Sequence, residues 1–139
     1  MSITFEKVLV LKNVPMFSGV SEIALADLIS ASEEKTYKAG EVLLEVGQES
    51  KAMYIILSGR VIFEHNGNVV RDLGPRFVFG EETVFSSMPS REKIIAREKT
   101  HLLMIESDRL MQMMALHSSL ARRFLRELSR RIQLKNEAF

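Results

Sequence analysis

The stretch MYIILSGRVIFEHNGNVV, residues 53–70, decides what kind of fold this sequence can form. β-Branched and other apolar residues fill 53–57, 61–63 and 69–70, and turn-forming residues separate these runs at Ser58-Gly59 and Asn66-Gly67-Asn68. Asn-Gly is a strong signal for a tight hairpin, because both residues tolerate a positive φ. The stretch therefore predicts short antiparallel strands that are joined by tight turns.

The same alternation of short β-forming runs and turns continues on both sides of this stretch. Further strands are expected at residues 36–37, 42–44, 94–96 and 102–105. Six of the seven glycines fall between Gly40 and Gly80, where they mark turns. Many short strands at regular spacing indicate a sandwich or a barrel-like roll. Residues 79–85 interrupt the strands and predict one short helical turn.

Helical patterns flank the β region. An amphipathic run at residues 5–11 is broken at Val14-Pro15, and Ser21 is a suitable N-cap for a helix that ends near Ser32. After residue 107, apolar residues recur at helical spacing. We therefore predict a mainly β fold, a double-stranded, jelly-roll-like β-roll with N-terminal helices and C-terminal B and C helices. We expect one domain over 1–139, with helices over 1–32, the roll over 33–106 and helices over 107–139.

The composition, 46% apolar and 27% charged, is that of a soluble globular protein, and it excludes several function classes. No apolar run reaches the roughly 20 residues of a membrane-spanning helix, and the N-terminus lacks a secretory signal pattern. The absence of cysteine excludes disulfides and thiol chemistry, and it fits a cytoplasmic location. The net charge of +1 argues against a dedicated nucleic-acid binder.

Neither a metal site nor an enzyme is expected. His65, His101 and His117 lie far apart in the sequence and near no carboxylate cluster with ligand spacing. No arrangement of serine, histidine and aspartate has the context of a catalytic nucleophile. The sequence therefore predicts neither catalytic nor metal-binding residues.

An ordered series of segments identifies a family. The segments are VPMFSGVS at 14–21, YKAGEVL with EVG at 37–47, MYIILSGRV at 53–61 and FGEE at 79–82. In this order and spacing they resemble the cyclic-nucleotide-binding domains of the catabolite activator protein, protein kinase A regulatory subunits and cyclic-nucleotide-gated channels. The resemblance covers nearly the whole chain.

The resemblance implies a phosphate-binding segment at residues 79–93. In such domains a short helix after the Phe-Gly-Glu motif presents backbone N–H groups to the cyclic phosphate, and a carboxylate matching Glu81 accepts a hydrogen bond from the ribose. An arginine further on pairs with the phosphate, and an apolar residue of the C-terminal helix covers the base. The implied ligand is cAMP or cGMP, with no other cofactor. The ligand-binding candidates are Phe79, Gly80, Glu81, Glu82, Thr83, Ser90, Arg91, Glu92, Phe124 and Leu128.

The position of the phosphate-binding arginine has two interpretations. Counted from Gly80 the position is Arg91, and counted back from the strand at 94–96 it is Ser90. Glu92 would place a negative charge beside a bound phosphate, at a cost of about 1–4 kcal/mol. Lys93 or Arg76, the latter in a turn where many relatives have glycine, is available to offset that charge.

The last helix also has two interpretations. Its apolar residues, among them Phe124, Leu128 and Ile132, recur at helical spacing with arginines on the other face. The helix either packs only on its own roll or forms a homodimer seam, as in the transcription-factor branch of the family; we favour the seam. Those transcription factors continue into a helix-turn-helix domain. Since this sequence stops at Phe139, no DNA-binding domain is expected in it.

Two hypotheses of function follow. In the first, the domain is a regulatory sensor in which a bound cyclic nucleotide repositions the C-terminal helix. In the alternative, the same fold binds no nucleotide and serves as an interaction or dimerisation module.

Overall fold

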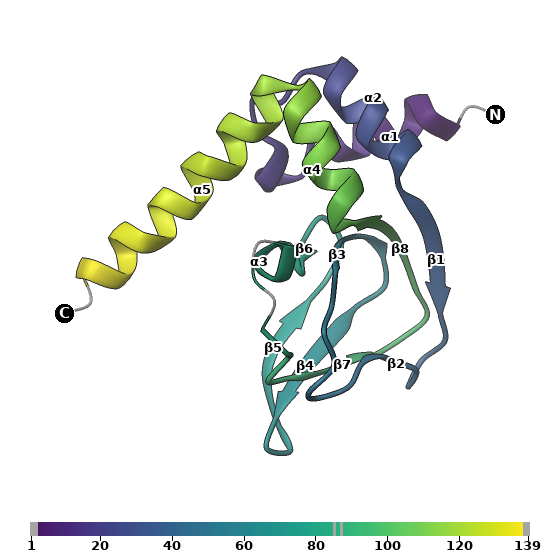
Figure 1. The fold of residues 1–139 in the computed structure, drawn as a ribbon. Helices are drawn as coiled ribbons and strands as arrows, with labels where there is room; N and C mark the ends of the chain where they lie inside the picture. Colours follow the sequence, from purple (N-terminus) through teal and green to yellow (C-terminus); the bar gives the residue numbers. More distant parts are fainter. Residues whose placement is uncertain (1–2, 85, 87, 138–139) are drawn as a thin grey trace.

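Two antiparallel sheets of four strands form a roll, with helices gathered at one end (Figure 1). This computed structural model describes residues 3–84, 86 and 88–137. The helices are α1 (Ile3–Lys12), the 3-10 helix η1 (Pro15–Phe17), α2 (Glu22–Ala31), α3 (Glu81–Val84), α4 (Ser107–Leu116) and α5 (Ser118–Glu137). The strands are β1 (Glu33–Tyr37), β2 (Val42–Leu44), β3 (Ala52–Ser58), β4 (Val61–His65), β5 (Asn68–Leu73), β6 (Val78–Phe79), β7 (Lys93–Ala96) and β8 (Thr100–Glu106). The strand orders are β1-β8-β3-β6 and β2-β7-β4-β5, so the predicted roll with flanking helices is confirmed.

The central strands β3 and β8 are buried on both faces. One face, which includes Met53 and Ile105, packs into a core that is shared with α1, α2, α4 and α5. The other face, which includes Ile56 and Leu102, packs inside the roll against residues of β4, β6 and β7. Burial on both faces explains why residues 52–57 form an almost unbroken apolar run.

Local signals in the sequence correspond to observed structure. Ser21 caps α2, since its hydroxyl oxygen accepts a hydrogen bond from the Ala24 N–H at 3.2 Å. Asn66 and Gly67 have φ angles of 53° and 81° and join β4 to β5 in the predicted tight hairpin. The helical pattern after residue 107 is divided at His117 into α4 and α5. The two-residue strand β6 is too short to give a periodic signal.

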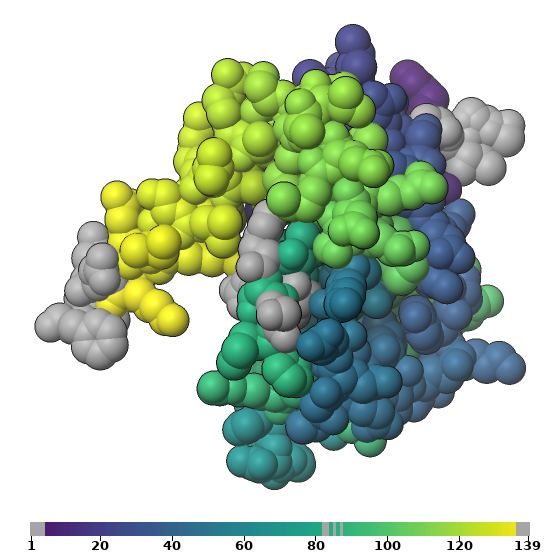
Figure 2. Space-filling model, viewed as in Figure 1, coloured from purple at the N-terminus to yellow at the C-terminus, as the bar shows by residue number. Residues whose placement is uncertain are grey.

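Helix α5 packs on the body through its first half and extends beyond it. Leu120 and Phe124 are buried in the helical core. The C-terminal half of α5 extends away from α1, α2 and α4 (Figure 1), and Figure 2 shows a notch between it and the roll. In the described residues, no helix has both the length and the apolarity that crossing a membrane requires.

Candidate ligand pocket

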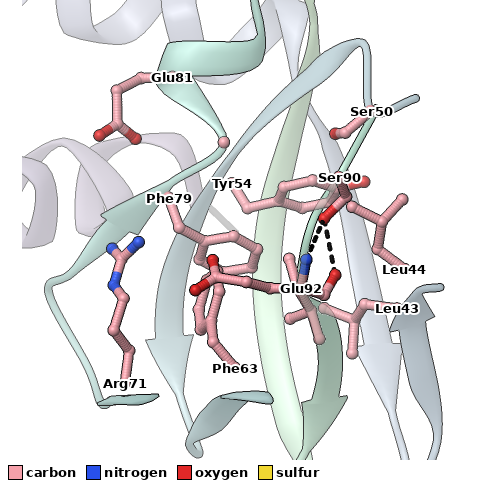
Figure 3. Close-up of a pocket in the computed structure, with 12 residues that line it drawn as sticks. Leu43, Leu44, Ser50, Tyr54, Phe63, Arg71, Phe79, Glu81, Ser90 and Glu92 are labelled. Carbon is pink, nitrogen blue, oxygen red and sulfur yellow. Dashed lines mark hydrogen bonds between the residues drawn. The ribbon is translucent and has the colours of Figure 1, made fainter. Parts of the chain in front are cut away.

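A cavity opens in the roll beside the β6–α3 corner (Figure 3). Its volume is about 100 Å³. Its floor is apolar and its rim carries hydroxyl groups and charges of both signs. The lining residues are Leu43, Leu44, Ser50, Tyr54, Phe63, Arg71, Phe79, Gly80, Glu81, Ser90, Glu92 and Ile94.

Aromatic rings form one wall of this cavity. Tyr54 stacks on Phe79 with ring centroids 4.9 Å apart, and Phe63 meets Phe79 edge-on at 5.5 Å. Burial raises the pKa of the Tyr54 phenol, with a smaller contribution from Tyr37 in the same direction. Tyr54 is therefore a neutral hydrogen-bond donor around pH 7.

Gly80 brings the chain into α3 by a turn that a side chain would obstruct. Its φ is +85°, and a Cβ at this position would lie 2.5 Å from the carbonyl oxygen of Ala52 in β3. The structure thus accounts for Gly80 by close packing of backbone on backbone within the fold. Glu82 and Thr83 belong to α3, but their side chains lie outside the described part of the structure.

Glu81 is the first residue of α3, and its side chain is only 8% exposed. Its Oε1 accepts a hydrogen bond at 2.9 Å from Nη2 of Arg131 in α5. Its Oε2 is buried and has no hydrogen-bond partner among the described residues. One oxygen of this carboxylate therefore contacts the last helix, and the other retains its capacity to accept a hydrogen bond.

The segment before β7 places Ser90 and Glu92 in the cavity and Arg91 outside it. Backbone hydrogen bonds fix Ser90 against the β2–β3 loop: its N–H donates to Gln48 at 2.9 Å, and its carbonyl accepts from Gly47 at 2.8 Å. The Ser90 hydroxyl donates to the Glu92 carbonyl at 2.6 Å. Arg91 lies in the bend before β7, is exposed, and lines an outer hollow that Ser90 and Glu92 also border.

Arg71 is the pocket residue that sequence reasoning missed. Its guanidinium lies 4.5 Å from the centroid of the Phe63 ring and makes no ion pair with a described residue. Phe63 and Arg71 are partners in the β4–β5 register, so both side chains lie on the same face of the hairpin. Counting residues outward from the Asn66-Gly67 turn could have revealed this pairing. A register shift between Phe63 and Glu64, however, moves the partner of Phe63 by one residue from the position that such a count gives.

The residues expected to cover a base do not reach the cavity. Phe124 is 2% exposed and lies in the helical core, and Leu128 is half-buried on α5; neither lines the pocket. Arg76 has a φ of 74° and lines a neighbouring hollow between α5 and the roll. The structure thus brings together Phe79, Gly80, Glu81, Ser90 and Glu92, and it leaves Arg91, Phe124 and Leu128 apart from them.

Comparison with known proteins gives the same fold. Residues 34–117 match the sequence profile described as "Cyclic nucleotide-binding domain". A CRP-like cAMP-activated global transcriptional regulator of Mycobacterium tuberculosis is 24% identical over 132 residues, 91% of this chain and 59% of that protein. The chain thus spans less than two thirds of this curated relative.

Solved structures of similar shape include sensor and regulator domains. The sensor domain of the transcriptional regulator DNR from Pseudomonas aeruginosa has a TM-score of 0.86 at 18% identity, covering 100% of this chain and 97% of that one. The N-terminal domain of a transcriptional regulator from Streptomyces coelicolor has a TM-score of 0.83 at 24% identity, covering 94% of this chain and 96% of that one. At these identities the likeness concerns the fold.

Proposed function

Because this chain belongs to the cyclic nucleotide-binding domain family, we propose that it is a regulatory sensor that binds a cyclic nucleotide, cAMP or cGMP, in the roll and signals through α5. The position of Glu81 carries this proposal, since the same carboxylate lines the cavity and contacts Arg131 of α5. A ligand that binds Glu81 therefore contacts a residue that is itself paired with α5. The curated relative is, by its name, activated by cAMP.

The cavity supplies groups for a sugar and for an aromatic base. Glu81 Oε2 can accept a hydrogen bond from a ribose hydroxyl, which would satisfy a buried charged atom. Phe63, Phe79 and Tyr54 offer ring faces and edges to a base. These features favour a ligand with one hydroxyl-bearing part and one aromatic part.

In this proposal Arg71, rather than Arg91, pairs with the cyclic phosphate. Among the described lining residues Arg71 is the one cation, and its stacking on Phe63 leaves its N–H groups available. A cavity of about 100 Å³ is smaller than the roughly 300–1,000 Å³ of typical small-molecule sites. Entry of a nucleotide therefore requires the flexible side chains of Arg71 and Glu92 to move.

Thermal shift with cAMP, cGMP and cyclic dinucleotides tests the sensor function. A ligand at a hundred times its Kd stabilises the folded state by about 2.7 kcal/mol, which raises the melting temperature. Arg71→Ala should abolish most of this shift, and Arg91→Ala should retain it as a matched control from the edge of the pocket. A full shift in Arg71→Ala together with a lost shift in Arg91→Ala would contradict the assignment of Arg71.

A second function is favoured by one observation, the presence of Glu92 in the cavity. Its carboxylate faces the space that a phosphate would enter, together with that of Glu81 (Figure 3). In this alternative the domain binds no nucleotide and acts as an interaction or dimerisation module. The absence of any thermal shift at millimolar nucleotide would select it over the sensor.

A homodimer through α5 is part of the proposal in either case. Ala121, Leu125, Leu128 and Ile132 follow the alternating four- and three-residue spacing of a coiled-coil seam. Leu125 and Ile132 are 66% and 61% exposed, beside the face that packs on the body. A second copy of the same helix is the occupant that such a self-complementary stripe fits.

A further inference from the structure

A second hollow lies outside the roll, between the β5–β6 turn (residues 74–77), η1 and α5. Its volume is about 390 Å³, within the roughly 300–1,000 Å³ of typical small-molecule sites. We call it the arginine hollow, because arginine is its most frequent lining residue. It is lined by Pro15, Met16, Arg76, Phe77, Val78, Glu81, Arg123, Glu127, Arg130 and Arg131.

The arginine hollow carries more positive than negative charge. Its described lining residues include four arginines and two glutamates. Glu127 accepts hydrogen bonds from Nε and Nη2 of Arg130 at 3.2 and 2.5 Å, and one from Arg123 at 3.4 Å. Glu81 accepts one from Arg131 at 2.9 Å. The two carboxylates neutralise two of the four guanidinium groups, so a surplus of two positive charges remains at the hollow.

Arg76 supplies a cation with no partner among the described residues: its guanidinium makes neither an ion pair nor a hydrogen bond with them. Its φ of 74° lies in the left-handed region, which disfavours a residue with a Cβ. Strand β3 holds this turn, because the Arg76 N–H donates to the Ile56 carbonyl at 3.0 Å and the Ile56 N–H donates to the Phe77 carbonyl at 3.0 Å. Strained residues of this kind cluster at ligand sites.

Arg130 and Phe77 add a donor and an aromatic ring to the same hollow. The Arg130 side chain is 58% exposed, and its Nη1 group makes no hydrogen bond with a described residue. Phe77 is 55% exposed and follows Arg76 in the turn. Guanidinium forks match the oxygens of a phosphate group. A phosphomonoester carries a charge of about −1.5 to −2 at pH 7, which complements the surplus of two positive charges.

We propose that the arginine hollow binds a small-molecule phosphomonoester that carries an aromatic group. Arg76 and Arg130 contact the phosphate, and Phe77 packs against the ring of the ligand. This site is separate from the cavity in the roll, so the inference does not rest on the proposed sensor function. The phosphate class also differs, since a phosphomonoester carries more negative charge than the cyclic phosphodiester that is proposed for the roll.

An NMR titration of the full chain with phenyl phosphate gives both the location and the affinity of binding. Backbone amide signals of residues 76–78 and 130 should shift, and those of 90–94 in the roll should not. Arg76→Gly should weaken binding about ten-fold or more, since a charged hydrogen-bond donor is lost. Glycine tolerates the positive φ, so this variant keeps the turn.

Arg126→Gln is the matched control for Arg76→Gly. It removes one positive charge from an exposed position of α5 outside the arginine hollow, so its affinity should equal that of the natural chain. Equal affinity of Arg76→Gly and the natural chain would overturn the proposal. So would unshifted signals of residues 76–78 at about 10 mM phenyl phosphate, a concentration that detects even a millimolar Kd.

Two further probes test the chemical class of the ligand. Phenyl sulfate keeps the ring but carries less negative charge, and inorganic phosphate keeps the charge but lacks the ring; both should bind less tightly than phenyl phosphate. Phe77→Ala should reduce the affinity for phenyl phosphate to that for inorganic phosphate. Equal binding of the sulfate and the phosphate ester would overturn the phosphomonoester assignment. Equal binding of inorganic phosphate and phenyl phosphate would overturn the aromatic part.

Discussion

Gly80, which lines the pocket, is also required by the packing of the backbone around it. An alanine at this position must adopt a φ near +85° and also place its Cβ 2.5 Å from the Ala52 carbonyl. We expect Gly80→Ala to lower the free energy of unfolding by about 3 kcal/mol, because strain and a backbone clash add together. Gly47 has a φ of +88° with nothing near its Cβ position, so Gly47→Ala should cost only about 1–2 kcal/mol.

Urea denaturation of both variants measures this difference in unfolding free energy. Equal losses in the two variants would show that the close approach to Ala52 contributes nothing.

Glu92 is the residue whose charge most opposes an anionic ligand. Replacing its carboxylate by an amide keeps the shape of the side chain and removes a like-charge contact of about 1 kcal/mol or more. Glu92→Gln should therefore bind cAMP or cGMP at least roughly five-fold more tightly, as measured by calorimetry. Glu64→Gln, at the position of β4 that pairs with Lys93, serves as a control for a general change in net charge. Weaker binding by Glu92→Gln would mean that the carboxylate contacts the ligand favourably.

At the scale of elements, strands and turns were predictable because their causes are local. Asn66-Gly67 fixed a hairpin, and Ser21 fixed the start of α2, through contacts that span only a few residues. The orientation of Arg91 was not predictable, because it depends on hydrogen bonds between Ser90 and the β2–β3 loop, more than forty residues earlier. A one-residue change of register in this segment exchanges which side chains enter the pocket.

Helix α5 should respond to acid through Glu127. A hydrogen bond from Arg130, followed by the charges of Arg130, Arg131 and Arg123, lowers the pKa of Glu127 below its ordinary value of 4.5, although burial opposes this shift. A carboxyl group with a lowered pKa in the folded state stabilises fully above its ordinary pKa, and this stabilisation is lost as the pH falls through the lowered value.

Unfolding free energies of the natural chain and of Glu127→Gln, measured from above pH 4.5 to below it, test whether ionised Glu127 stabilises the fold. The natural chain should be the more stable above pH 4.5, and the difference should shrink as the pH falls below that value. Asp72, whose pKa is also lowered, chiefly by a hydrogen bond from Arg60, contributes equally to both proteins and cancels in the difference. A difference that is independent of pH would contradict the role of the ionised carboxylate.

At the scale of the whole molecule, the exposed seam on α5 predicts a dimer. Leu125→Glu with Ile132→Glu should convert a dimer to a monomer, since the charges would face each other across the seam. Sedimentation equilibrium measures the mass, and Arg126→Glu on the exposed arginine face is the control that should remain dimeric. A natural chain that stays monomeric at about 100 µM, well above the Kd of a stable dimer, would contradict the seam.

The sequence pattern predicted the strands and helices, but it did not predict the contacts between elements that lie far apart in the sequence. Spaced motifs from Val14 to Glu81 predicted the roll and its helices, and the sheets confirm them. The pairing of Glu81 with Arg131 depends on how α5 docks on the body, which no local period encodes. Phe124 illustrates the same limit: its helical spacing marked it as apolar and inward-facing, but docking places it in the helical core and not over the pocket.

The most direct test is hydrogen exchange of the full chain with and without saturating cAMP or cGMP. The proposed sensor predicts slower amide exchange in two places at once, residues 79–84 at the pocket and the C-terminal half of α5, because Glu81 and Arg131 connect them. Unchanged exchange with both nucleotides at millimolar concentration would contradict binding. Protection confined to the pocket would contradict signalling through α5.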